Sequence, residues 1–266
     1  MSNLRYEITF DSATAQRNAL GVSVSLDIAG RGPVLLSFPA WTPGSYEIAN
    51  FARFVRDFAA TADGKPLDWD KLDYDTWRID PAGARRVTVR FEYLATALDN
   101  AMAWSRPDFA FVNGTNIFPY PEGRGFDFPA TVTVKTQPGW LVATGMQSAG
   151  APGSYREAGY HDLVDKPLFI GRFDLDSVQV EGRWNRLATY PAGAMTGPAR
   201  SLLWDQIAKT VPKMATVFGE TPWQTYTTLL VFTREVGGGS ALEHANSHVG
   251  IYNPGFIGNP LLASIT

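Results

Sequence analysis

Apolar and polar residues alternate in short runs over the first two thirds of the chain. Examples are the runs from Tyr6 to Phe10, from Val22 to Ile28, from Val87 to Tyr93 and from Val132 to Val134. A period of two places apolar side chains on one face of a strand and polar ones on the other. Turn signals such as Pro43-Gly44 separate the runs. The pattern predicts an all-β N-terminal domain over residues 1–185, built as a sandwich or saddle of antiparallel sheets.

The pattern changes to a helical period near residue 195. Between Pro198 and Phe218, apolar residues follow one another at steps of 4, 4, 3 and 4, at Leu203, Ile207, Val211, Met214 and Phe218. This spacing forms one face of an amphipathic helix and predicts the first long helix between about 196 and 220. Pro212 lies inside it and is expected to kink or break it, because proline lacks the N–H and crowds the preceding turn.

A strand pattern over Tyr226 to Phe232 follows this helix, and the chain then ends on the apolar run from Leu261 to Thr266. That run contains no helix stop signal. We therefore expect the first turns of another helix there and a chain truncated from a longer protein. The whole chain is predicted to be α+β, with a β domain over 1–185 and the beginning of a second domain over 186–266.

Composition and charge narrow the functional classes. The chain has 266 residues, of which 45% are hydrophobic and 18% charged, and this is enough for a sizeable core. A net charge of −3 provides no basic footprint for nucleic acid and no polybasic attraction to a membrane. The absence of cysteine excludes disulfides, thiolate nucleophiles and cysteine-zinc sites. The N-terminus lacks a signal-peptide run, so a cytoplasmic location is expected, or a periplasmic one if a signal peptide had been removed.

Two of the three histidines are spaced as metal ligands on a helix would be. His244 and His248 are four residues apart, which on a helix places both rings on one face. Ala245 stands where the zinc-peptidase motif H-E-x-x-H has its general-base glutamate. Polar residues on a strand or loop are therefore the favoured interpretation, and no metal site is expected within this chain.

A run of glycines precedes an isolated carboxylate. Gly238 and Gly239 lie just before Glu243 and His244. Glycines let a ligand backbone approach and pair with the main chain. A carboxylate beyond them could hold a free α-amino group through a charge-assisted hydrogen bond. The alternative is a flexible hairpin turn with a solvated glutamate.

A second functional class is a non-catalytic β-sandwich module that binds glycan or protein through exposed indoles. Its candidate platforms are Trp41, Trp69, Trp77 and Trp104. Exposure decides between this class and the first, since buried indoles cannot stack on a ligand. The chain carries no phosphate-binding glycine motif, no dinucleotide fingerprint and no G-x-S-x-G elbow.

Four motifs, in order, resemble those of the glycyl aminopeptidase family, the PDZ-bearing members of the thermolysin-like zinc peptidases. They are Trp41 to Tyr46, similar to W-x-P-G-S-Y; Lys71 to Trp77; His161 to Gly171, with Lys166 where the family has serine; and Gly237 to Ser247, similar to G-G-G-L-E-H-x-N-S with Ser240 and Ala241 added. The resemblance spans almost the whole chain.

The resemblance implies that residues 186–266 begin a thermolysin-like catalytic domain and stop before its zinc-binding helix. Glu243 matches the glutamate that anchors the substrate α-ammonium, and Gly238, Gly239 and His244 belong to the same substrate-binding segment. The zinc ligands are expected just beyond Thr266, and a PDZ domain later. The implied parent is a zinc-dependent metalloaminopeptidase that removes small, for example glycyl, residues from peptides with a free N-terminus. The chain by itself is expected to be inactive and to hold no tightly bound Zn²⁺.

Overall fold

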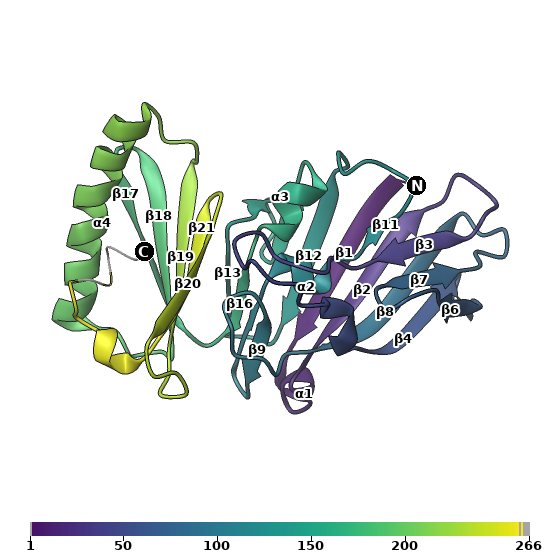
Figure 1. Ribbon diagram of the computed structural model, residues 1–266, viewed down its shortest axis with the longest axis horizontal. Coiled ribbons are helices and arrows are strands. Elements are labelled where there is room, and N and C mark those ends of the chain that lie inside the picture. Colours follow the sequence, from purple (N-terminus) through teal and green to yellow (C-terminus); the bar gives the residue numbers. More distant parts are fainter. Residues whose placement is uncertain (1, 261, 263–266) are drawn as a thin grey trace. The chain divides into compact units, whose positions relative to one another are not determined.

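The computed structural model describes residues 2–260 and 262. The chain forms two compact units, with Met1–Val142 and Met146–Gly171 in unit 1, and Ala143–Gly145 and Arg172–Thr266 in unit 2 (Figure 1). This division falls earlier than the predicted boundary after residue 185, because two strands that precede residue 191 belong to the sheet of unit 2.

Unit 1 is built around an eight-stranded sheet. In order across the sheet its strands are β14 (Gln147–Ser148), β15 (Ser154–Glu157), β12 (Ala130–Thr136), β1 (Ser2–Phe10), β2 (Ala19–Asp27), β8 (Arg86–Leu94), β4 (Val55–Ala62) and β5 (Lys65–Pro66). β1 pairs with β2 in antiparallel register and with β12 in parallel register. The predicted antiparallel β architecture is confirmed, with this parallel pair inside it.

Two four-stranded sheets complete the β structure of unit 1. One has the order β13 (Leu141–Thr144), β16 (Leu168–Gly171), β10 (Phe109–Val112) and β9 (Ala103–Arg106); the other has β11 (Tyr120–Pro121), β3 (Val34–Ser37), β7 (Thr76–Ile79) and β6 (Trp69–Lys71). The connections include the short helices α1 (Ser12–Ala15), η1 (Phe51–Phe54), α2 (Gly114–Ile117) and α3 (Tyr160–Val164).

The core of unit 1 lies between these sheets. Alternate residues of β1 are buried, at Tyr6, Ile8 and Phe10, as the period of two predicts. They share one cluster with side chains of both smaller sheets, such as Leu36 and Ile170. The packing of sheet on sheet makes unit 1 a β-sandwich, and Figure 1 shows β3 and β7 lying against the large sheet.

Two of the family-like motifs have structural roles in this sandwich. In the turn between β6 and β7, the Asp73 carboxylate accepts hydrogen bonds from the N–H groups of Asp75 and Thr76. The turn leads to Trp77, whose buried indole stacks on Phe58 with ring centroids 5.0 Å apart. The His161 to Gly171 motif forms α3 and then β16.

Unit 2 is a five-stranded sheet with one long helix. Its strand order is β17 (Asp174–Val180), β18 (Arg183–Tyr190), β19 (Thr225–Phe232), β21 (Ser247–Tyr252) and β20 (Gly239–His244), followed in the chain by η2 (Pro254–Phe256). β18, β19 and β21 are parallel, and the two outer strands are antiparallel to their neighbours. The helix α4 (Gly197–Phe218) lies along one face of this sheet (Figure 1). The whole chain is therefore α+β, as predicted.

α4 confirms the prediction of the first long helix, since the earlier described helices have at most 5 residues. Pro212 was expected to kink or break this helix, and the break does not occur, because α4 continues through Pro212 to Phe218. Proline removes a single intrahelical hydrogen bond, to the carbonyl of residue 208, and Ala208 is exposed, so water can satisfy that carbonyl. The predicted helix start at Leu261 to Thr266 lies outside the described residues, except for Leu262. Over residues 2–260 and 262, no helix has the length and apolar character that crossing a membrane requires.

An ion pair fixes the beginning of α4 to β17. Arg200 donates hydrogen bonds to the Asp176 carboxylate, to Oγ1 of Thr189 at 2.7 Å and to the carbonyl of Leu187 at 3.0 Å. Nε1 of Trp204 donates to the same carboxylate at 3.0 Å. Partial burial raises the pKa of Asp176, but the hydrogen bonds from Arg200 and Trp204 outweigh it and hold the pKa below its ordinary value.

Asp176→Asn is expected to lower the free energy of unfolding of unit 2 by about 1.5–3 kcal/mol, the range for hydrogen bonds to charged groups. The Arg200 side chain is 13% exposed and the Asp176 side chain 45% exposed, so water replaces the lost carboxylate only in part at the Arg200 end of the pair. The stabilisation is present above the ordinary aspartate pKa of about 3.9 and is lost as the pH falls through the lowered folded value.

Denaturant unfolding at pH 7 and pH 3 measures this effect. The matched control is Asp70→Asn, which removes a second arginine partner. The Arg78–Asp70 pair is 48% and 51% exposed, and exposed pairs contribute about 0–1 kcal/mol. If Asp176→Asn and Asp70→Asn lower the free energy of unfolding equally, the burial of Arg200 does not strengthen its ion pair.

Candidate functional site

The β20–β21 hairpin carries the candidate substrate-binding residues. The two strands are joined by a two-residue turn at Ala245 and Asn246, and Glu243 lies directly opposite His248. Glu243 is exposed, and His248 is buried. Directly opposed residues share one face of a sheet. This face is the one that packs under α4, since Ala241 and Tyr252 of the same alternation belong to the cluster that includes Leu203 of α4.

β20 forms the edge of its sheet, and no further strand pairs with its outer side among the described residues. The N–H of Asn253 donates to the carbonyl of Gly238 at 2.7 Å, so the even-numbered residues of this segment pair with β21. The backbone groups of Gly239, Ala241 and Glu243 are consequently directed outward. An edge of this kind can accept an extended peptide as an added strand.

The glycines before Glu243 differ in their surroundings. A Cβ at Gly239 would lie 2.3 Å from Cδ1 of the Tyr252 ring, and one at Gly250 would lie 2.2 Å from Cε2 of the same ring. Both glycines therefore let Tyr252 pack flat on the hairpin. A Cβ at Gly238 would meet nothing within 4 Å. A ligand backbone can therefore approach Gly238 closely without obstruction. At Gly239, the absence of a side chain is also needed for the packing of the Tyr252 ring.

The two neighbouring histidines lie on two strands of a hairpin and not on one helix. His244 is the residue after Glu243 on β20, and its side chain points to the other face of the sheet, away from His248 on β21. Zinc sites use three or four protein ligands. The described residues contain no group of three or more histidine, aspartate or glutamate side chains that could hold a metal. The residues present thus do not fit the zinc ion that the resemblance implies.

The pKa of His248 is strongly influenced by burial. Burial and, to a smaller extent, the nearby His244 lower the pKa of His248, the Glu243 carboxylate opposes both, and the resulting pKa is about 4. The His248 imidazole is therefore neutral at pH 7. A neutral imidazole donates a hydrogen bond from one ring nitrogen and accepts one at the other.

An apolar groove of about 980 Å³ lies between the second half of α4 and the sheet of unit 2. Val211, Met214 and Phe218 line it from α4, and Asn185 and Thr228 line it from the sheet. Thr228 is next to His248 in the β19–β21 register. The polar row of the sheet therefore runs from this groove to Glu243 at the edge.

The four tryptophans proposed as glycan platforms do not form one exposed set. Trp77 and Trp104 are 3% and 4% exposed, whereas Trp41 and Trp69 are 52% and 42% exposed. Trp77 and Trp104 are core residues and cannot stack on a ligand. The β-sandwich module interpretation thus retains two of its four platforms.

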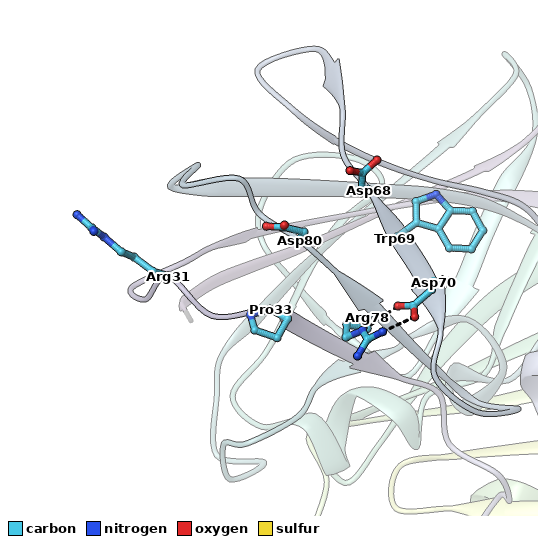
Figure 2. Close-up of a pocket in the computed structure, with 7 residues that line it drawn as sticks. All are labelled: Arg31, Pro33, Asp68, Trp69, Asp70, Arg78 and Asp80. Atoms are coloured by element: carbon cyan, nitrogen blue, oxygen red, sulfur yellow. Dashed lines mark hydrogen bonds and ion pairs between the residues drawn. The ribbon is translucent and has the colours of Figure 1, made fainter.

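Trp69 lines a shallow groove of about 480 Å³ in unit 1, with charged neighbours (Figure 2). Arg78 pairs with Asp70 across it at 2.5 Å. Arg31 points away from the other lining residues (Figure 2). In ligand sites, a few polar groups converge on one point. The charged groups that line this groove do not converge, so they do not favour a ligand site here.

The Trp41 to Tyr46 motif forms a loop closed at its base. The N–H groups of Ala49 and Asn50 donate to the carbonyl of Ala40, at 2.8 and 2.9 Å. Thr42 of this loop and Thr115 of α2 are both buried, and their hydroxyls lie 2.5 Å apart. These bonds hold the loop while Tyr46 remains almost fully exposed. Loops with close ends and their own internal packing are frequently functional.

Comparison with known proteins agrees with this architecture. The chain matches a structure of an aminopeptidase N family protein from Idiomarina loihiensis with a TM-score of 0.86 and 25% identity, over 96% of this chain and 43% of that one. An M1 zinc metallopeptidase mutant from Deinococcus radiodurans, bound to a Tyr-Ser-Ala substrate, matches with a TM-score of 0.54 and 13% identity, over 93% and 59%. Yeast LTA4 hydrolase in complex with bestatin matches with a TM-score of 0.58 and 14% identity, over 97% and 41%.

The chain thus spans less than two thirds of the length of each of these structures. None of the curated protein sequences matches it. The family model for the Peptidase M61 N-terminal domain matches residues 5–172. Because this match covers more than half of the chain, the chain belongs to the family of the Peptidase M61 N-terminal domain.

Proposed function

We propose that this chain is the front part of a zinc-dependent aminopeptidase that removes small N-terminal residues, such as glycine, from peptides. Three features support the proposal: the family of the N-terminal domain, the fold shared with aminopeptidases and zinc metallopeptidases, and the β20 edge with its carboxylate. The parent protein is proposed to carry a PDZ domain after its catalytic domain.

The single observation that carries the proposal is the geometry of β20. The strand is an open edge, and the backbone groups of Gly239, Ala241 and Glu243 are directed outward from it. An extended peptide paired there would run alongside the Glu243 side chain, which is exposed. A carboxylate at the end of a substrate strand can hold a terminal ammonium group by charge-assisted hydrogen bonds.

This arrangement explains why the enzyme would act on chain ends. An ammonium bound by Glu243 fixes the position of the first residue of the peptide. The scissile bond then lies at a fixed distance along β20. An internal segment of a peptide has no ammonium group to place beside Glu243, so it would not be held in this position. Gly238 has no side chain and would leave room for the peptide main chain. His244 follows Glu243 in the same substrate-binding segment, and its side chain lies on the other face of the sheet.

Zinc belongs to the proposal for the parent protein and not to this chain. The residues described here do not fit a zinc ion, so its ligands are proposed to lie in the part of the parent that this chain does not include. When bound, zinc would activate the attacking water. The contribution of this chain is to bind and orient the peptide.

The proposal is tested with the full-length protein and a pair of tripeptides, one with a free amine and one N-acetylated. Release of the first residue from the free-amine peptide is expected, together with its loss after zinc chelation and its return on adding zinc. Mass spectrometry of the products measures it. Comparable cleavage of the acetylated peptide would contradict the aminopeptidase assignment, and cleavage that survives chelation would contradict the zinc dependence.

A further inference from the structure

Three polar residues lie in one row across the sheet of unit 2, on the face that packs under α4. Thr228 on β19 is in register with His248 on β21, and His248 is in register with Glu243 on β20. The next row on the same face is Leu230, Gly250 and Ala241, which is apolar. The sheet therefore places a polar row from its interior to the edge that carries Glu243.

His248 has a nitrogen atom with no hydrogen-bond partner in its buried surroundings. The residue is only 3% exposed, and its Nε2 makes no hydrogen bond in the structure. Leaving a buried polar atom without a partner costs free energy, so such an atom calls for an explanation. Glu243 is the directly opposed residue on the next strand, and Cβ atoms of such pairs are about 4.5–5.5 Å apart. The influence of Glu243 on the pKa of His248 agrees with this proximity.

We propose that His248 is a positioning residue for Glu243, to which it donates a hydrogen bond from Nε2–H when Glu243 holds the substrate ammonium. This inference rests on the proposed function. Glu243 projects from an exposed edge strand, where a long side chain is free to change rotamer. His248 is fixed by burial within the sheet, so a hydrogen bond from it restricts the carboxylate to the orientation that faces the peptide. Because the imidazole is neutral at pH 7, it orients Glu243 without neutralising the charge that attracts the ammonium.

Activity measurements in the full-length protein test the inference through two variants. His248→Leu removes the donor at similar size, and His248→Gln retains an N–H donor. We expect His248→Leu to lower kcat/KM on free-amine peptides about 3- to 10-fold, the effect of one ordinary hydrogen bond. The loss should appear mainly in KM, and His248→Gln should restore part of it.

A double-mutant cycle with Glu243→Gln separates this inference from the proposed function. If His248 acts through Glu243, adding His248→Leu to Glu243→Gln causes no further loss. Losses that multiply in the double variant overturn the inference but leave the proposed function in place. A Glu243→Gln variant with full activity overturns the proposed anchor, and the inference with it.

A further measurement leaves His248 in place, so its result does not depend on whether the His248 variants fold. NMR titration of the 266-residue chain gives the pKa of His248 with and without Glu243→Gln. The carboxylate stabilises the imidazolium, so its removal is expected to lower the pKa of His248. A pKa of His248 that stays the same in Glu243→Gln overturns the inference.

Discussion

Glu243→Gln in the full-length protein is expected to lower kcat/KM on free-amine peptides about 10- to 150-fold. The amide has the size of the carboxylate but lacks the charge that pairs with the substrate ammonium. Hydrogen bonds to charged groups contribute about 1.5–3 kcal/mol, which corresponds to this range in rate. Glu243 is exposed on an edge strand and stabilises no core contact, so the fold and the zinc content of the protein should stay the same.

The matched control for this prediction is Glu235→Gln, a second exposed glutamate close to the glycine run. It lies before the hairpin and not on β20, so kcat/KM should change little. Substrate form provides the other control, because N-acylated peptides present no ammonium and should lose less. An unchanged kcat/KM in Glu243→Gln would show that the residue is a solvated side chain. An equal loss of kcat/KM on N-acylated and free-amine peptides would show that Glu243 maintains the structure of the site and does not bind the ammonium group.

Gly171→Ala is expected to destabilise unit 1 by roughly 2 to 6 kcal/mol, from an overpacking cost and a backbone cost of about 1–3 kcal/mol each. Gly171 has φ +134°, a conformation that residues with a side chain rarely adopt. A Cβ at this position would lie 2.2 Å from the carbonyl oxygen of Asp108 and 2.7 Å from Cα of Phe109. Both atoms are backbone of the neighbouring strand region and cannot turn away as a side chain can.

Thermal unfolding followed by near-UV circular dichroism measures this loss, which corresponds to a fall in Tm of roughly 4–24 °C for a domain of this size. Two other glycines separate its causes. Gly139 also has a positive φ but open space around it, so Gly139→Ala carries the backbone cost alone. Gly32 has neither constraint, and Gly32→Ala should be neutral. A Gly171→Ala variant as stable as Gly139→Ala would contradict the overpacking cost, because β10 and β16 would then make room for the Cβ without loss of stability.

The family-like motifs were visible in the sequence, but their roles were not. Trp77 and Gly171 occur in motifs that the sequence linked to an enzyme family, and the structure gives both residues packing roles in the sandwich. A motif records that certain residues occur together, and it does not say whether they pack or bind. Burial distinguishes the two, and burial depends on which segments of the chain meet. Trp41 and Trp77 look alike in sequence, yet one is exposed and the other is in the core.

The candidate site was predicted in part. The glycines and Glu243 were identified from their order in the chain, and their assignment to substrate binding stays a proposal. The spacing of His244 and His248 suits two ligands on a helix, but polar residues on a strand or loop were the favoured interpretation, and the structure places the two histidines on β20 and β21. A separation of four residues puts two side chains on one face of a helix, but in a hairpin it crosses the turn.

The alternation of apolar and polar residues was enough to predict the antiparallel β architecture of the N-terminal domain and the position of α4. Each depends on patterns that repeat over many neighbouring residues, so single exceptions such as Pro212 do not obscure them. The folded chain was needed to see that β20 is an edge strand and that His248 lies opposite Glu243. Strand order and register arise from contacts between segments far apart in the chain, since β21 pairs with both β19 and β20. A local pattern states which face of a strand is apolar, and it contains no information about the neighbour that covers it.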